Sequence, residues 1–154
     1  MLNIIARKAI LCYNNAIENN IKMLNQDNTK KSKIALIEDD RVLSNILNIN
    51  LIQKGYETIC IFNGNEVIEI VQNERPSLIL LDIILPGQNG LELLQLMKND
   101  EVMRQIPVLI TSNLGDDSIV KKGISMGAVD YIIKSDNSLA SIISKIENTL
   151  GLNL

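Results

Sequence analysis

The chain of 154 residues contains no histidine. This absence excludes a histidine nucleophile, a histidine general base and a histidine metal ligand, and the chain itself cannot carry a phosphohistidine. Any bound metal must therefore be held by oxygen atoms, which favours Mg²⁺, Ca²⁺ or Mn²⁺.

Cysteine and long apolar runs are also scarce. The two cysteines, Cys12 and Cys60, lie far apart in the sequence and form no Cys-x-x-Cys pair, which argues against a disulfide framework or a zinc site. No apolar run approaches the roughly 18 to 20 residues that span a bilayer. The apolar piece at 9–12 is too short for the core of a signal peptide. We therefore expect a cytoplasmic protein without a membrane span.

The size and charge of the chain further limit the class of protein to which it can belong. The length fits one domain with a real core, and 46% hydrophobic and 21% charged residues are ordinary for a soluble globular protein. Residues 1–33 carry six basic and two acidic side chains, about +4, so the remainder carries about −7 of the total charge of −3. An acidic domain behind a small basic leader is a poor candidate for direct nucleic-acid binding.

We divide the chain into an N-terminal extension, 1–32, and a domain, 33–154. In the extension the apolar positions Ile10, Ile17, Ile21 and Leu24 fit one stripe of an amphipathic helix, and a polar linker follows. This leader is interpreted as a docking helix, a partner-binding helix or a loosely attached extension, and the sequence leaves the three open.

The domain alternates between two kinds of segment. Apolar strands are expected at 33–37, 56–62, 77–82, 108–113 and 128–135. Helices are expected between and after them, at 41–55, 63–74, 90–103, 116–127 and 138–150. Such alternation predicts an α/β fold with a parallel sheet, in which ligands bind beyond the carboxyl ends of the strands.

Polar residues gather at these strand ends. Glu38, Asp39 and Asp40 follow the first strand, Asp82 ends the third, Ser112 lies at the end of the fourth and Lys134 near the end of the fifth. Crowded carboxylates would repel one another, and a divalent cation, with Mg²⁺ favoured, would relieve this. A lysine and a hydroxyl beside the metal suit a phosphoryl group, with Asp82 as the nucleophile that forms an acyl phosphate.

The stretch 33–150 resembles the receiver domain of bacterial two-component response regulators, of the stand-alone chemotaxis-regulator type. The resemblance rests on "LIEDD", "LLDIILPGQNG", "PVLITSN" and "GAVDYIIK", which occur in the expected order and spacing. It implies a flavodoxin-like, doubly wound, five-stranded parallel sheet in the order 2-1-3-4-5, with five helices.

The same resemblance implies roles for individual residues. The metal, Mg²⁺ or Mn²⁺, would be held by Glu38, Asp39, Asp82 and the backbone carbonyl of Ile84. Asp82 would accept the phosphoryl group, assisted by Lys134 and Ser112. Ser112 and Tyr131 would be the switch residues, and Asp40 would cap the following helix.

The implied function is a phosphorylation-dependent switch in a two-component system or phosphorelay. It is not an enzyme beyond catalysing its own phosphoryl transfer and dephosphorylation. Because the chain has no histidine, a sensor histidine kinase, a phosphotransfer protein or a small phosphodonor must supply the phosphoryl group. A downstream protein would bind the surface formed by 116–127, 128–135 and 138–150, homodimerisation is left open, and only four residues follow the last helix, too few for an effector domain.

Three positions either differ from the family pattern or bear on the lifetime of the acyl phosphate. Ser135 follows Lys134 where the family usually has proline, which leaves open whether this bond is cis or trans. Ile84 and Leu114, two residues after the acceptor and the switch hydroxyl, are apolar and cannot orient an attacking water. We therefore expect slow self-dephosphorylation.

Other interpretations compete with this one. Each polar residue taken alone has an ordinary explanation, such as an acidic helix start or a buried cap. A flavodoxin-like cofactor carrier would need a phosphate loop where this chain has "EDDR", and an aspartyl phosphatase would need a second Asp where Ile84 stands. A degenerate receiver that acts only as a constitutive interaction module is the remaining alternative.

Overall fold

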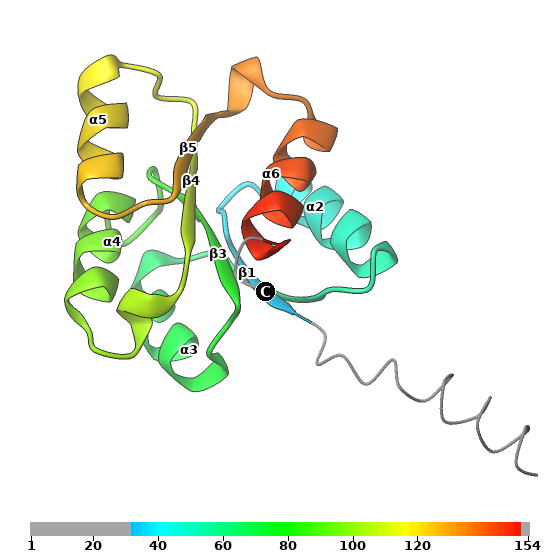
Figure 1. Ribbon diagram of the computed structural model, residues 1–154, viewed down its shortest axis with the longest axis horizontal. Helices are drawn as coiled ribbons and strands as arrows, with labels where there is room; N and C mark the ends of the chain where they lie inside the picture. Colours follow the sequence, from blue (N-terminus) through cyan, green and yellow to red (C-terminus); the bar gives the residue numbers. More distant parts are fainter. Residues whose placement is uncertain (1–31, 152–154) are drawn as a thin grey trace, which may run out of the picture. The chain divides into compact units, whose positions relative to one another are not determined.

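A computed structural model describes residues 32–151 (Figure 1). The predicted leader helix within 1–24 lies outside the described residues, as do 152–154. None of the helices in 32–151 has the length and apolar content needed to cross a membrane.

Five strands form a single sheet in the order β2-β1-β3-β4-β5, and every pair is parallel. The strands are β1 (Lys33–Ile37), β2 (Glu57–Ile61), β3 (Leu78–Asp82), β4 (Val108–Ser112) and β5 (Asp130–Ile133). This confirms the predicted fold class and strand order.

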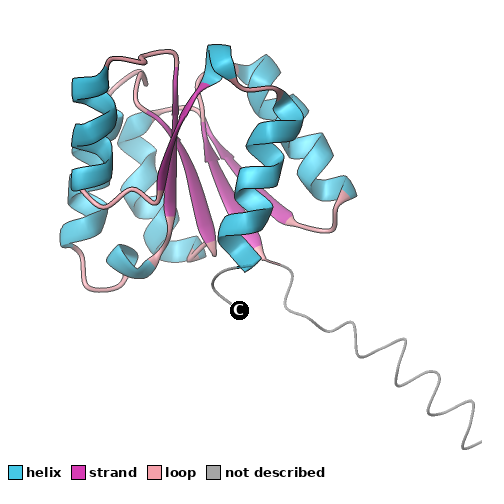
Figure 2. Ribbon diagram, turned by 45° about the horizontal axis from the view of Figure 1, so that its top comes forward, coloured by secondary structure: helices cyan, strands magenta, loops and turns pink. Residues whose placement is uncertain are grey.

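Five α-helices cover the sheet on both faces (Figure 2). They are α2 (Arg41–Gln53), α3 (Val67–Glu74), α4 (Gly90–Asn99), α5 (Asp117–Ser125) and α6 (Leu139–Gly151). Helices α2 and α6 lie on one side of the sheet, and α3, α4 and α5 lie on the other (Figure 1).

The strands are apolar on both faces because both faces are covered. Side chains alternate along β1, so Ile34 and Leu36 pack in the cluster with α2 and α6, whereas Ala35 and Ile37 pack in the cluster with α3 and α4. The fully buried residues of β3 divide in the same way. The sheet is therefore sandwiched between two separate apolar layers, and only its edges meet solvent.

Local signals explain where several elements end. Gly55, at φ +91°, terminates α2, and its N–H donates to the carbonyl of Ile52 at 2.9 Å. The helix expected at 90–103 ends earlier, at Asn99. The Asp100 carboxylate accepts hydrogen bonds from the N–H groups of Val102 and Met103 at 2.9 and 2.8 Å and starts a short 3₁₀ turn, η2 (Met103–Gln105). An Asp side chain competing for backbone N–H groups is the physical reason for this correction.

The strand expected at 128–135 is also shorter than predicted. It covers only Asp130–Ile133, and Lys134–Asp136 form a 3₁₀ turn, η3. At the other end of the expected strand, Gly127 at φ +100° bends the chain before β5 begins. The helix expected at 63–74 likewise opens with a 3₁₀ turn, η1 (Gly64–Glu66), before α3.

Candidate functional site

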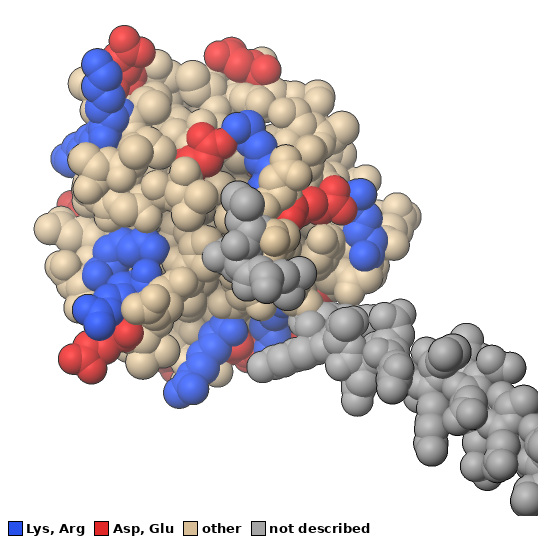
Figure 3. Space-filling view, viewed as in Figure 1, with Lys and Arg blue, Asp and Glu red and all other residues tan. Residues whose placement is uncertain are grey.

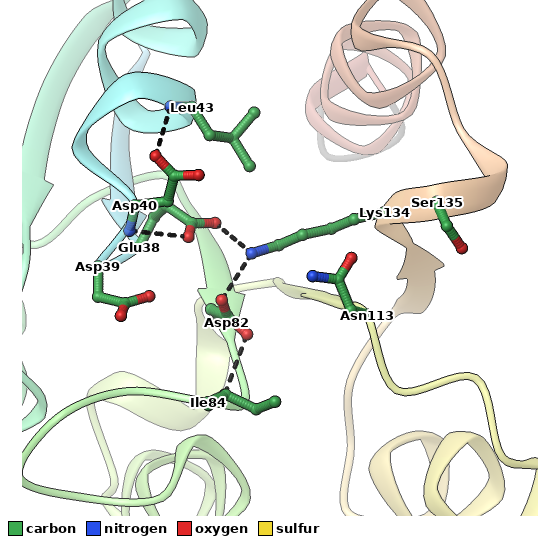
Figure 4. Close-up of a pocket in the computed structure, with 9 residues that line it drawn as sticks. All are labelled: Glu38, Asp39, Asp40, Leu43, Asp82, Ile84, Asn113, Lys134 and Ser135. Carbon is green, nitrogen blue, oxygen red and sulfur yellow. Dashed lines mark hydrogen bonds and ion pairs between the residues drawn. The ribbon is translucent and has the colours of Figure 1, made fainter.

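The polar residues predicted at the strand ends meet at one edge of the sheet. Glu38 and Asp39 directly follow β1, Asp82 ends the neighbouring β3, and Lys134 directly follows β5. Because the strands are parallel, their carboxyl ends lie at the same edge. There they line a pocket of about 420 Å³, whose full lining is Glu38, Asp39, Asp40, Leu43, Asp82, Ile84, Asn113, Lys134 and Ser135 (Figure 4).

Three carboxylates form the acidic side of this pocket. Glu38, Asp39 and Asp82 each place one oxygen so that the three atoms lie within 4.8 Å of one another. Glu38 and Asp82 are only 2% and 5% exposed, whereas Asp39 is open to solvent. Burial at this level is costly for ionised carboxylates unless a cation or hydrogen-bond donors compensate.

Lys134 supplies that compensation. Its Nζ lies 2.6 Å from Oδ2 of Asp82 and 2.6 Å from Oε2 of Glu38. Burial by itself lowers the pKa of Lys134, but the interactions with the carboxylates of Asp82 and Glu38 outweigh it and raise the pKa overall. The lysine therefore stays charged and bridges the two buried acids, reaching across the pocket from β5 (Figure 4).

The environment of Glu38 raises the pKa of its carboxyl group. Burial raises the pKa of its carboxyl group, and the nearby charge of Asp82 acts in the same direction. The ion pair with Lys134 and a 3.2 Å hydrogen bond from the Asp40 N–H to Oε1 oppose this rise without cancelling it. Lys134 and the Asp40 N–H therefore do not fully compensate the negative charge of the buried Glu38 carboxylate.

Asp40 has a structural role, as the sequence predicts. Its Oδ1 accepts hydrogen bonds from the N–H groups of Val42 and Leu43, at 2.9 and 3.2 Å, and so caps the N-terminus of α2. Although Asp40 lines the pocket, it is not one of the three carboxylates that converge there.

The loop after β3 contributes backbone groups. The Ile84 N–H donates to Oδ1 of Asp82 at 3.0 Å, so the two oxygens of this carboxylate have different partners, an amide and an ammonium. The Ile84 side chain is 55% exposed at the rim of the pocket. Asp82 is therefore the last residue of the buried strand, and 83–85 begin the loop.

Ser112 and Tyr131 both lie outside the pocket lining and contact the backbone of Leu114. Ser112 is fully buried, and its Oγ accepts a hydrogen bond from the Leu114 N–H at 3.1 Å. The Tyr131 hydroxyl donates to the Leu114 carbonyl at 2.6 Å, and burial raises the pKa of this tyrosine. Both residues thus contact the backbone of the same residue in the loop that follows β4.

Besides Asp40, three pocket residues were not among the predicted site residues, namely Leu43, Asn113 and Ser135. Asn113 follows Ser112 at the end of β4, so its position at a strand end was the available signal. Ser135 lies in η3, and its hydroxyl donates to Asp136 at 2.8 Å instead of to the carboxylates. There is no cis peptide bond within residues 32–151, so the Lys134–Ser135 bond, left open by the sequence, is trans.

The residues of the pocket fit a divalent metal. Oε2 of Glu38 is buried and has no hydrogen-bond donor with suitable geometry among the described residues, so its sole compensation is the ion pair with Lys134. One lysine faces three converging carboxylates, which leaves the cluster short of positive charge. An all-oxygen set open to solvent on the side of Asp39 is the donor chemistry that Mg²⁺ and Mn²⁺ prefer.

Comparisons with known proteins agree with this geometry. A family model described as the response regulator receiver domain matches residues 34–147. The crystal structure of the BeF₃-activated receiver domain of RstA from Klebsiella pneumoniae has a TM-score of 0.71 and 28% identity, and the match covers 77% of this chain and 98% of that one.

Two further structures show the same similarity. A two-component response regulator from Clostridium difficile has a TM-score of 0.72 and 25% identity, over 78% of this chain and 96% of that one. The Mn²⁺-bound form of the response regulator Rcp1 has a TM-score of 0.64 and 27% identity, over 69% of this chain and 83% of that one.

Proposed function

This chain belongs to the family of response regulator receiver domains, and from that premise we propose that it is a signalling switch that accepts a phosphoryl group on Asp82. The observation that carries the proposal is the buried Asp82 carboxylate, which lies 2.6 Å from Lys134 and within a cluster of acids at the mouth of a pocket. A carboxylate that lies beside a lysine ammonium at a strand end and lines a pocket is suited to act as a nucleophile.

The proposed reaction is transfer from a phosphohistidine of a partner kinase or phosphotransfer protein. An oxygen of Asp82 attacks phosphorus, a P–O bond forms while the P–N bond breaks, and the imidazole leaves with the electron pair of the broken bond. The Lys134 ammonium, which now pairs with Oδ2, would then also pair with the phosphoryl oxygens.

Magnesium, or manganese, is part of the proposal. Glu38, Asp39, Asp82 and the backbone carbonyl of Ile84 would hold the ion. When bound, the ion would neutralise negative charge on the phosphoryl oxygens. The three carboxylates that already lie within 4.8 Å of one another support this assignment.

The phosphodonor needs a surface beside the pocket. Helix α2 begins at the pocket and exposes Val42, Ile46 and Ile49, with spacings of four and three residues that place them on one face. Val42 is 69% exposed, which is unusual for a large apolar side chain. We propose that the helical domain carrying the phosphohistidine packs on this stripe, because the stripe is continuous with the pocket.

The signal would leave through the opposite side of the pocket. The phosphoryl group would attract the Ser112 hydroxyl, which now accepts a hydrogen bond from the Leu114 N–H. This would change the loop after β4, whose Leu114 carbonyl also binds the Tyr131 hydroxyl. The surface of α5, β5 and α6 would then bind a downstream protein. In Figure 3 acidic and basic side chains lie in small mixed groups on the visible face, which fits a protein partner better than nucleic acid.

Further details belong to the same proposal. Ile84 and Leu114 offer no side-chain hydrogen bond to an attacking water, so self-dephosphorylation, the other reaction that the chain would catalyse, should be slow. A chemotaxis-regulator-like role in the cytoplasm is a part of the proposal that the sequence resemblance alone supports. The competing proposal, a constitutive interaction module without phosphorylation, is disfavoured by the presence of Asp82, Lys134 and the acidic pair in one pocket.

Intact mass measurement after incubation with acetyl phosphate or phosphoramidate and Mg²⁺ tests the proposal. The wild-type chain should gain the mass of one phosphoryl group, and Asp82→Asn should gain none. No gain in the wild type would favour the constitutive module. A gain that persists in Asp82→Asn would remove Asp82 as the acceptor.

A further inference from the structure

Two loops that are distant in sequence are fitted together beside the pocket. The loop of residues 62–66 follows β2 and contains η1, and the acceptor loop, residues 83–89, follows Asp82. The Gly64 N–H donates to the carbonyl of Pro86 at 3.0 Å, which joins the two loops by a backbone hydrogen bond. Neither loop takes part in the sheet, so this contact depends on their own packing.

Glycine is required on both sides of this contact. A Cβ on Gly64 would lie 2.9 Å from the backbone oxygen of Gln88 and 3.0 Å from its backbone nitrogen, and Gly64 is buried. A Cβ on Gly87 would lie 2.6 Å from Oδ1 of Asn63 and 2.9 Å from Nδ2 of Asn65. Gly64 therefore allows a close approach to the backbone of Gln88, whereas Gly87 leaves room for the side chains of Asn63 and Asn65 and adopts a φ of +91° that glycine favours.

The acceptor loop is held at two points, and Ile84 lies between them. At its base, the Gly90 N–H donates to the Ile83 carbonyl at 2.9 Å, and at its tip Pro86 accepts from Gly64. Between these points the Ile84 N–H donates to Oδ1 of Asp82 at 3.0 Å. These hydrogen bonds hold the Ile83–Ile84 peptide group on one side and the Pro86 carbonyl on the other, so the Ile84 carbonyl lies in the short stretch between two anchored peptide groups.

We propose that Gly64 and Gly87 are positioning residues, which lock the acceptor loop against the loop after β2 and so orient the Ile84 peptide toward the metal and phosphoryl site. The effect on metal binding and phosphoryl transfer rests on the proposed function, but the contact between the two loops can be measured without metal or phosphodonor. Neither glycine touches the reacting groups, so they act through the backbone of the acceptor loop.

The chain offers a matched control for each glycine. Gly64 and Gly151 both lack a left-handed φ, but a Cβ on Gly151 would meet nothing within 4 Å. Gly87 and Gly55 share a φ of +91°, but a Cβ on Gly55 would also meet nothing. Comparing Gly64→Ala with Gly151→Ala, and Gly87→Ala with Gly55→Ala, separates the loop contact from the general cost of replacing glycine.

Amide hydrogen exchange without metal is the first measurement. Gly64→Ala and Gly87→Ala should speed exchange at the amides of 83–89 relative to their controls, while amides in β3 keep the protection of the wild type. Equal loop exchange in each variant and its control would overturn the inference. If Gly64→Ala does not fold, Asn63→Ala tests the loop contact in its place. This variant adds no atom and removes the Asn63 side-chain oxygen that packs on Gly87.

Mn²⁺ titration is the second measurement. The dissociation constant should rise by about tenfold in Gly64→Ala, the lower end of the effect of partners that orient a metal ligand, and should not change in Gly151→Ala. If the wild-type chain binds Mn²⁺ and Gly64→Ala binds it with the same dissociation constant, the inference about the glycines is contradicted but the proposed function is not. A wild-type chain that neither binds Mn²⁺ nor takes up a phosphoryl group would contradict the proposed function, and loop exchange would still test the lock.

Discussion

Lys134 Nζ lies 2.6 Å from Oδ2 of Asp82, although the two residues are 52 positions apart in the sequence. The same ammonium pairs with Glu38, so one lysine is the shared counter-charge of two buried acids. This relationship means that the residue expected to assist phosphoryl transfer also stabilises the fold. Replacement of Lys134 should therefore change stability and function together.

Replacing Lys134 should lower the stability of the folded state. Lys134→Met leaves Glu38 and Asp82 buried without their cation, and we expect a loss of about 3 kcal/mol in the free energy of unfolding, the lower end for breaking a buried pair because the pocket is open on one side. Urea unfolding without metal measures this loss. Mg²⁺ should restore more stability to the variant than to the wild type.

The exposed pair of Lys54 and Glu147 provides the control for this experiment. Its atoms lie 2.9 Å apart, but both side chains are more than a third exposed. Lys54→Met should therefore cost about 0–1 kcal/mol. Equal losses in Lys54→Met and Lys134→Met would contradict the role given to the pocket lysine.

The neighbouring acids Asp39 and Asp40 should behave differently. Asp40→Ala removes the N-cap of α2 and should cost about 1 kcal/mol of stability, with metal affinity nearly unchanged. Asp39→Ala should weaken metal binding and leave metal-free stability almost unaffected, because Asp39 is exposed. Urea unfolding and Mn²⁺ titration of both variants check this, and loss of affinity in Asp40→Ala alone would reverse the two roles.

The rim residue Ile84 should control the lifetime of the acyl phosphate. Ile84→Asn introduces a side chain that can orient water near Asp82, so the rate of dephosphorylation should rise, whereas Ile84→Val should leave it unchanged. Loss of phosphoryl mass over time, after removal of the phosphodonor, measures the rate. An unaltered rate in Ile84→Asn would count against the assignment of slow hydrolysis to this position.

The apolar stripe of α2 should matter for a protein phosphodonor only. Ile46→Lys should slow phosphoryl transfer from a kinase or phosphotransfer domain but not uptake from acetyl phosphate. Leu96→Lys on α4 is the control, because Leu96 is 47% exposed and Ile46 42%. Slowing with both donors would indicate damage to the pocket instead of a docking role.

Tyr131 should make stability fall at alkaline pH. Burial raises its pKa above the ordinary value of 10.0, so the folded state holds the phenolic proton more tightly than the unfolded state does. Its contribution is complete below pH 10.0 and is lost as the pH rises through the pKa of the folded state. Urea unfolding across this range should show a weaker decline for Tyr131→Phe than for the wild type, and parallel declines would exclude the effect.

Much of the fold could be predicted because its signals are local. The apolar runs around Ile34 and Leu80, the glycine at position 55 and the acids after β1 are patterns within a few residues, and such patterns specify strands, helix ends and strand-end side chains. The boundaries that were wrong, among them the end of α4 at Asn99 and the end of β5 at Ile133, depend on side chain to backbone hydrogen bonds and tight turns, which periodicity does not report.

The sequence by itself therefore determined the order of the elements and which polar residues come at the carboxyl edge of the sheet. Only the tertiary structure decided that Lys134 bridges Glu38 and Asp82, that the Tyr131 hydroxyl donates to the Leu114 carbonyl, and that Gly64 meets Gln88. These contacts join segments far apart in the chain. Their distances are set by how helices and loops pack on the sheet, and no local pattern of residues encodes that packing.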